Sequence, residues 1–360
     1  MQDKVSILLL NYNWLKFNRP CLDSLSKQSY QDFEILFVDN NSTDWSLEEV
    51  KNIYKKDIAT EKIKIIENKH NYGFAEGNNI GASHANKDSK YICLLNNDTI
   101  LPTNRLEELT QGIKSDPALG IVWSFVLDKW FEQQMKDLLF KQKKMWVNNY
   151  IMETSLRDLT DKEIAEWILY TTGIGWCALL YKKEIIIKPF PSFYFAYWED
   201  TYLSLCNILS WHKAALCTKS IVHHLGSGSF WKKVSVLKAF HGAKNQLCNI
   251  LIFHTRANRI KLIPTYLLYQ CAKIFSWSPF IRFKGLCKAI FWCITHTQEI
   301  SNQREQVKKL QKISNKQFIA ELSNKVFENT YFLKIPKYQS TIMSILNTLC
   351  KFYFRLVNIK

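Results

Sequence analysis

Short apolar runs alternate with amphipathic stretches over the first 125 residues of the chain. Each run is four to six residues long and rich in β-branched or aromatic side chains, which is typical of buried strands. We therefore predict four strands, at Val5–Leu10, Phe33–Val38, Ile63–Ile66 and Tyr91–Leu95.

The stretches between these runs repeat their apolar residues at helical spacing. The pattern predicts helices over Phe17–Lys27, Leu47–Tyr54 and Gly77–Ala85, and the segment Ser42–Asp44 supplies N-cap residue types before the second helix. Alternating strands and helices predict an α/β fold, with a mostly parallel central sheet covered by helices on both faces.

Polar residues follow each predicted strand. They are found in Asn11-Tyr12-Asn13, in Asp39–Asp44, in Asn68–Asn79 and in Asn96-Asn97-Asp98-Thr99. Ligands bind at the carboxyl ends of the strands in sheets of this kind. The sequence therefore predicts that short hydrogen-bonding side chains gather in one crevice.

The chain after residue 125 adds three features. A charged, Lys/Gln-rich stretch over residues 128–169 has a helical pattern and is predicted to be a helical insertion. The aromatic segment Phe190–Trp198 then leads into Glu199-Asp200, and the pair His223-His224 precedes a Gly-Ser-Gly loop. We expect the first domain to end near residue 230.

Net charge separates the chain into two regions. The formal charge is +16, yet residues 231–360 alone hold 22 Lys and Arg against 4 Asp and Glu. Residues 1–230 hold 26 Lys and Arg against 28 Asp and Glu and are nearly neutral. This asymmetry predicts two regions with different roles, a first domain over 1–230 and a basic region over 231–360, which we expect to be mainly helical.

The basic region admits three interpretations: a solvated surface, a nucleic-acid-binding surface or a surface that docks on anionic lipid. Its cations interrupt apolar stretches, and the longest charge-free part in its apolar middle, Leu262–Ala272, is too short to span a membrane. No nucleic-acid-binding motif accompanies the charge, so we expect no nucleic-acid partner. Cations interleaved with Trp, Phe and Leu favour an anionic membrane surface as the partner.

The cysteines and the N-terminus indicate a cellular compartment. Ten cysteines form no Cys-x-x-Cys pair and several lie inside apolar runs, which is typical of core thiols in a reducing environment. The run Val5–Leu10 is too short for the apolar part of a signal peptide. We expect a cytoplasmic protein that binds peripherally to the inner face of the cell membrane.

The residue types at the strand ends suit a nucleotide-sugar. Asp39 can accept the imide N–H of uracil or thymine, and Asp98 can supply an oxygen ligand to Mg²⁺ or Mn²⁺. Glu199-Asp200 offers a general base for an acceptor hydroxyl. His224 could complete the metal shell or touch the diphosphate, although His223 beside it leaves the choice between the two open.

These motifs resemble those of family 2 glycosyltransferases, and most closely the rhamnosyltransferase-like branch that builds bacterial cell-surface polysaccharides. The resemblance runs in order over about residues 4–230. It rests on Val5–Asn13, Val38–Asp44, Asn71–Asn79, Leu94–Thr99 and Phe195–Asp200.

The resemblance implies a GT-A fold, a nucleotide-diphosphate sugar donor (UDP- or dTDP-linked), a divalent metal and inversion at the anomeric carbon. It assigns Asp39 to the base, Asp98 and His224 to the metal, Asp200 to the catalytic base and Glu199 to acceptor positioning. The remaining nucleotide-sugar contacts would come from Asn11, Asn41, Asn71, Gly73, Asn78, Asn79, Asn96 and Asn97.

Three positions depart from the family pattern. Asn97 replaces the usual proline of Asn-Pro-Asp, and Tyr202 and Cys206 stand where an Asp and an Arg often follow. Acceptor specificity is therefore not transferred from relatives. The sequence predicts a hexosyl-type transferase acting on a glycan or lipid-linked acceptor, with a non-catalytic scaffold of the same fold as the alternative.

Overall fold

The computed structural model describes residues 2–128, 144–148, 154–158, 166–175, 177–186, 188–225, 235–276, 278–322 and 337–359. The chain forms two compact units. The first contains Met1–Lys143, Leu159–Phe195 and His212–Gly228, and the second contains Lys144–Asp158, Ala196–Trp211 and Ser229–Lys360. The last division, between Gly228 and Ser229, lies next to the boundary predicted near residue 230. Two earlier segments, residues 144–158 and 196–211, also belong to the second unit.

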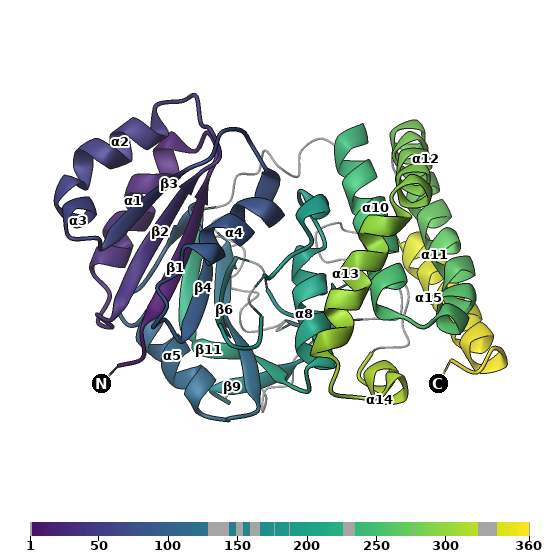
Figure 1. The fold of residues 1–360 in the computed structure, drawn as a ribbon. Coiled ribbons are helices and arrows are strands. Elements are labelled where there is room, and N and C mark those ends of the chain that lie inside the picture. The colour runs from purple at the N-terminus through teal and green to yellow at the C-terminus, as the bar shows by residue number, and fades with distance from the viewer. Residues whose placement is uncertain are drawn as a thin grey trace. The chain divides into compact units, whose positions relative to one another are not determined.

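The first unit is built on a mixed sheet (Figure 1). Its four N-terminal strands are parallel and run in the order β3-β2-β1-β4. Their bounds are Val5–Asn11 (β1), Phe33–Asp39 (β2), Ile63–Glu67 (β3) and Tyr91–Asn96 (β4). All four predicted strands are confirmed, and each continues one residue further into the polar segment that follows it.

Five further strands extend this sheet beyond β4. Strand β10 (Ala178–Lys182) lies antiparallel between β4 and β6 (Leu119–Asp128), and β11 (Lys213–His224) is parallel to β6. Strands β5 (Thr99–Ile100) and β9 (Ile168–Thr171) pair antiparallel with β11. The pairing of β5 with β11 joins the residues after β4 to the C-terminal end of β11.

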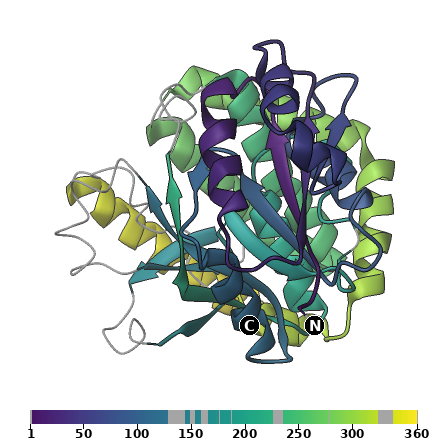
Figure 2. The ribbon, with the colours of Figure 1, turned by 90° about the vertical axis from the view of Figure 1, so that its left-hand side faces the viewer.

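Helices cover both faces of the sheet, as predicted. Helices α1 (Leu15–Ser26), α2 (Ser46–Ile53) and α5 (Arg105–Lys114) bury apolar side chains on the face that carries Val5, Ile7 and Leu9. The short α3 (Lys55–Ala59) follows α2, and Figure 2 turns the side with α1 and α2 toward the viewer. Alternate strand residues point to opposite faces, so Leu8 and Leu10 meet α4 (Gly73–Ser83) on the other side.

The described parts of residues 128–169 form strands, whereas the sequence predicted a helical insertion there. In its described parts, β7 (Lys144–Asn148) and β8 (Thr154–Asp158) form an antiparallel hairpin, and β9 completes the segment. The backbone groups of β7 and β8 find hydrogen-bond partners across the hairpin, which strand pairing supplies between segments that are close in sequence. Residues 129–143, 149–153 and 159–165 of the insertion lie outside the described ranges.

The second unit is mainly helical. Helix α10 (Val236–Phe253) packs against α11 (Arg256–Ser276), α12 (Pro279–Thr295) and α13 (Thr297–Leu310), and α13 also contacts α8 (Glu199–Leu209). Contact between α10 and α12 is close because Gly285 lies against the backbone of Ala239 and Phe240. Helices α14 (Asn315–Ala320) and α15 (Lys337–Leu356) complete the described part. Among the helices described, none is both long and apolar enough to cross a membrane.

Candidate active site

The ends of β1 and β2 share a buried hydrogen-bond network centred on Asn11. The Asn11 side-chain amide donates to Asp39 Oδ1 at 2.7 Å and to Ser46 Oγ at 2.7 Å. Asp39 Oδ2 accepts the backbone N–H of Ser42 at 2.9 Å. Asn11 is fully buried and Asp39 is 2% exposed, so the carboxylate is held by fixed donors rather than by water.

Asn18 orients the Asn11 amide from helix α1. Its Nδ2 donates to Asn11 Oδ1 at 2.9 Å, and its own Oδ1 accepts from Asn97 Nδ2 at 2.8 Å. Asn97 also lies 3.3 Å from Asn11 Oδ1, so the ends of β1 and β4 are joined through these amides. Our sequence prediction did not include Asn18. The sequence feature that could have indicated Asn18 is its place, as a polar residue, on the apolar stripe that contains Cys21, Leu22 and Leu25.

A second network links the end of β2 with the start of α4. Asn40, which was also not predicted, donates to Gly73 O at 3.0 Å and to Asn71 Oδ1 at 3.3 Å, and its Oδ1 accepts from Asn68 at 2.7 Å. Asn71 Oδ1 accepts the Gly73 N–H at 2.8 Å. These bonds fix the turn that leads into α4.

Gly73 has a structural reason to be glycine. Its φ is +77°, and a Cβ placed there would lie 2.5 Å from Phe195 O. The same carbonyl accepts the N–H groups of Phe74 at 2.6 Å and Ala75 at 3.1 Å. Phe195 therefore caps two N–H groups in the first turn of α4.

The other predicted nucleotide contacts occupy different environments. Asn78 donates to Phe74 O at 2.8 Å within α4, and the Asn79 amide is engaged by Glu76 and by both backbone groups of Phe190. Asn41 is exposed, with a left-handed φ of 62°. Asn96 is half-buried at the end of β4. The bonds of Asn78 and Asn79 are thus directed to the protein itself.

Asp98 and His224 meet at the end of the β5–β11 pairing. The register places His224 opposite Thr99, and Asp98 O accepts the N–H of Leu225 at 2.7 Å. His224 Nε2 lies 3.2 Å from Asp98 Oδ2, and the two residues are 9% and 8% exposed. His223 faces Ile100 in the same register and is half-buried, so the geometry favours His224 as Asp98's partner.

This pair fits one side of a Mg²⁺ or Mn²⁺ site. Ligands at right angles, each about 2.1 Å from one ion, are separated by about 3 Å, close to the observed gap. Carboxylate and imidazole suit Mn²⁺, and such ions keep water and substrate phosphates as further ligands. Within the described ranges no group of three or more His, Cys, Asp and Glu is placed to hold a metal.

Glu199 and Asp200 begin helix α8 in the second unit. Burial raises the pKa of Asp200 to about 6, although the N–H and hydroxyl of Thr201 bond its Oδ1 and oppose the shift. Burial and the neighbouring Asp200 charge raise the pKa of Glu199 to about 8. Glu199 is half-buried as a residue, but its Oε2 atom is shielded from solvent. Near neutral pH, Asp200 is mostly ionised and Glu199 mostly protonated.

The backbone before this pair is strained. Phe195, Tyr197 and Trp198 have φ angles of 59°, 75° and 68°. Bulky residues with left-handed φ cost about 1–2 kcal/mol each and persist only where the surroundings hold them. Strain of this kind is concentrated at functional sites, which supports a functional role for the Glu199-Asp200 segment.

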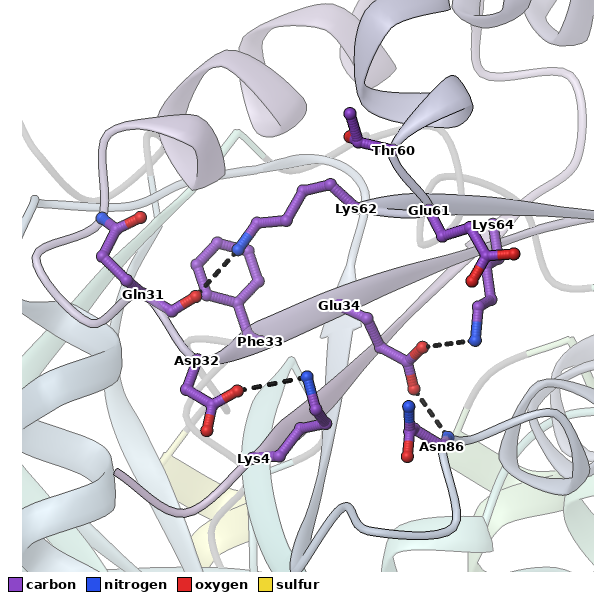
Figure 3. Close-up of a pocket in the computed structure, with 10 residues that line it drawn as sticks. All are labelled: Lys4, Gln31, Asp32, Phe33, Glu34, Thr60, Glu61, Lys62, Lys64 and Asn86. Carbon is purple, nitrogen blue, oxygen red and sulfur yellow. Dashed lines mark hydrogen bonds and ion pairs between the residues drawn. The ribbon is translucent and has the colours of Figure 1, made fainter. Parts of the chain in front are cut away.

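A pocket of about 410 Å³ lies at the opposite edge of the sheet, where β1, β2 and β3 begin (Figure 3). Lys4 pairs with Asp32 at 3.1 Å and Lys64 pairs with Glu34 at 2.8 Å across it. Its charged groups compensate one another, and it lies away from the carboxyl ends of the strands. We do not assign it to the active site.

The mixed α/β sheet with helices on both faces is a GT-A-like fold, which two solved structures share. The chain resembles GalNAc-T7, solved with UDP, GalNAc and Mn²⁺, with a TM-score of 0.57 and 14% identity over 84% of this chain and 58% of that one. It also resembles the mannosyltransferase PcManGT of Pyrobaculum calidifontis, solved with GDP-Man and Mn²⁺. The TM-score there is 0.51, with 13% identity over 99% and 88% of the two chains.

Residues 6–186 match the model of glycosyl transferase family 2, and the chain belongs to this family. The glycosyltransferase GlyG of Streptococcus pneumoniae serotype 4 is 24% identical over 167 residues, which are 46% of this chain and 52% of GlyG. The matched segment thus spans about half of that relative. Asp39 and Asp98 lie inside the family match, whereas Asp200 and His224 follow it.

Proposed function

We propose that this chain is an inverting glycosyltransferase that moves a sugar from a UDP- or dTDP-sugar to an acceptor hydroxyl. The observation that carries the proposal is the 3.2 Å approach of Asp98 and His224 at a carboxyl edge that also holds the Asn11–Asp39 network. A donor base would bond the free lone pairs of Asp39, and the diphosphate would lie toward Asp98. Family membership and the Mn²⁺-containing structural neighbours support the assignment.

In this proposal Asp98 and His224 hold a divalent ion, Mn²⁺ or Mg²⁺, which neutralises the departing diphosphate when bound. Asp200 takes the proton of the acceptor hydroxyl as that oxygen attacks the anomeric carbon. The bond from the anomeric carbon to the diphosphate oxygen breaks, and the nucleoside diphosphate leaves. Because Glu199 is protonated near neutral pH, it would donate a hydrogen bond to the acceptor.

The acceptor is proposed to be a glycan or lipid-linked sugar of cell-surface polysaccharide biosynthesis, as in the rhamnosyltransferase-like branch. Outward-facing residues of α12 support binding to a membrane surface, which we propose is the inner face. Phe280, Phe283, Phe291 and Ile294 are 57–76% exposed on this helix. Lys284 and Lys288 lie on the same exposed stripe, whereas Gly285 and Ala289 are buried toward α10.

Such a stripe matches the composition of helices that lie in a membrane interface. Helix α15 carries a similar one, with Ile345, Leu349, Phe352 and Leu356 each more than half exposed and Lys351 and Arg355 between them. Apolar residues would enter the headgroup region while the cations bind anionic lipid. A lipid-linked acceptor would then be presented where the enzyme is bound.

Transfer from a panel of labelled UDP- and dTDP-sugars to membrane extracts tests the activity. Wild-type protein should release the nucleoside diphosphate and label the lipid fraction, and Asp200→Asn should do neither. If no donor is turned over by wild-type protein that binds one of them, the chain is the non-catalytic scaffold of the alternative hypothesis.

A further inference from the structure

Asn245 of helix α10 bonds the strained segment that precedes Glu199. Its side-chain Nδ2 donates to Ala196 O at 2.9 Å and to Tyr197 O at 2.8 Å. Both acceptors are backbone carbonyls, so only a hydrogen-bond donor can make these bonds, and the two N–H groups of one amide supply both. Asn245 is fully buried, which makes its hydrogen bonds worth more than bonds at a solvated surface.

These two carbonyls belong to the peptide groups that set the start of α8. Tyr197 and Trp198 have left-handed φ angles of 75° and 68°, and Trp198 is the N-cap of the helix. Glu199 and Asp200 come directly after it. A rotation of either peptide would therefore change the direction in which both carboxyl side chains leave the backbone.

The neighbouring helices hold the same segment without replacing these bonds. Lys273 Nζ of α11 lies 5.5 Å from the centre of the Trp198 ring, and a Cβ at Gly242 of α10 would lie 3.7 Å from the indole Nε1, an ordinary packing distance. Both contacts hold the Trp198 side chain. The peptide groups before it are held by Asn245.

We propose that Asn245 is a positioning residue for the acceptor-activating pair, Glu199 and Asp200. The inference rests on the proposed role of Asp200. It assigns a catalytic contribution to the basic C-terminal region, which the sequence connected only with membrane binding. No contact between Asn245 and substrate is required.

The test compares Asn245→Ala and Asn245→Asp with Asn249→Ala in the full-length protein. Asn249 is equally buried one turn further along α10 and controls for the loss of a buried amide. Asn245→Asp keeps the shape but turns an oxygen toward two carbonyls. Both Asn245 variants should lower kcat about 10- to 100-fold while leaving the affinity for the nucleotide-sugar unchanged.

A second readout separates positioning from stability. Release of the segment would hydrate Asp200, so the acidic limb of the pH–rate profile should move to lower pH in Asn245→Ala and stay in place in Asn249→Ala. The proposal would be overturned if the Asn245 variants fold and keep both the wild-type kcat and the wild-type acidic limb of the pH–rate profile. It would also be overturned if both Asn245 variants unfold while Asn249→Ala folds. If Asp200→Asn itself stays active, the proposed base has failed instead.

Discussion

Asn11 presents its amide N–H to Asp39 across 2.7 Å because Asn18 donates to the opposite end of the same amide, at Asn11 Oδ1. The orientation of a buried amide is thus fixed from an adjacent helix, and Asp39 is left with ordered lone pairs. A preorganised carboxylate of this kind binds an N–H donor such as a nucleobase imide without reorganising.

Asp39→Asn is expected to weaken nucleotide-sugar binding about 10- to 100-fold, since a bond to a charged acceptor contributes roughly 1.5–3 kcal/mol. Asp44→Asn is a matched control, because Asp44 likewise accepts two N–H bonds, in its case from the backbone of Leu15 and Ser46. Titration calorimetry should show a lower affinity for the nucleotide-sugar in Asp39→Asn and an unchanged affinity in Asp44→Asn. Equal affinities for Asp39→Asn and wild type would refute its role in binding the base.

The raised pKa of Asp200, about 6, predicts the acidic limb of the pH–rate profile. Because only the ionised carboxylate accepts a proton, kcat/KM should rise as pH passes through about 6. Asp200→Asn should lower kcat/KM about 10²- to 10⁴-fold. Glu199→Gln should lower kcat/KM by less than about tenfold at pH 7, since the amide resembles the protonated acid. A rate that stays flat down to pH 4 would argue against Asp200 as the base.

Glu199 should also make the fold less stable at alkaline pH. Its pKa is raised in the folded state from 4.5 to about 8, so the folded state holds a proton that the unfolded state releases. Stability from this group is complete below pH 4.5 and is lost as pH rises toward 8. The free energy of unfolding, measured with urea in the presence of a metal chelator, should decline less between pH 5 and 8 for Glu199→Gln than for wild type. Parallel curves for variant and wild type would contradict the assignment.

The exposed stripe of α12 predicts how the protein binds vesicles. Phe280→Ser with Phe291→Ser should abolish co-sedimentation with anionic vesicles. Lys284→Gln with Lys288→Gln should weaken vesicle binding roughly 30-fold, since two cations at about 1 kcal/mol each contribute about 2 kcal/mol. Ile53→Ser, at a 43% exposed residue of the first unit, should bind like wild type. If instead the aromatic variant changes only the oligomeric state, the stripe is an interface between copies of the chain.

The N-terminal half of the fold was predictable because its signals are local. Each of the first four strands is an apolar run followed by polar residues, and the alternation of these strands with helices predicts that they are parallel. The strands after residue 119 depend on long-range pairing. Nothing near Ala178–Lys182 indicates that this strand is antiparallel between β4 and β6, because its partners are distant in sequence.

The site was predictable to the extent that its residues follow strands. Asp39 and Asp98 are found this way, but the partner of Asp98 depends on a two-residue strand, β5, pairing with the end of β11. Asn18 and Asn245 lie on helices, where a buried amide is recognised only once its acceptor is known. The start of α2 shows the same limit. Its N-cap is Trp45, with φ at 65°, rather than a residue of Ser42–Asp44.

The central claim is that the Asp98 end of the site binds a nucleotide-diphosphate sugar through a divalent metal. Thermal unfolding of wild type, Asp98→Ala and Asp200→Asn, with UDP- and dTDP-sugars in the presence or absence of Mn²⁺, tests it most directly. A donor at 100 times its Kd should stabilise wild type and Asp200→Asn by about 2.7 kcal/mol, only with Mn²⁺, and leave Asp98→Ala unshifted. An Asp98→Ala protein that retains the full Mn²⁺-dependent shift would contradict the account.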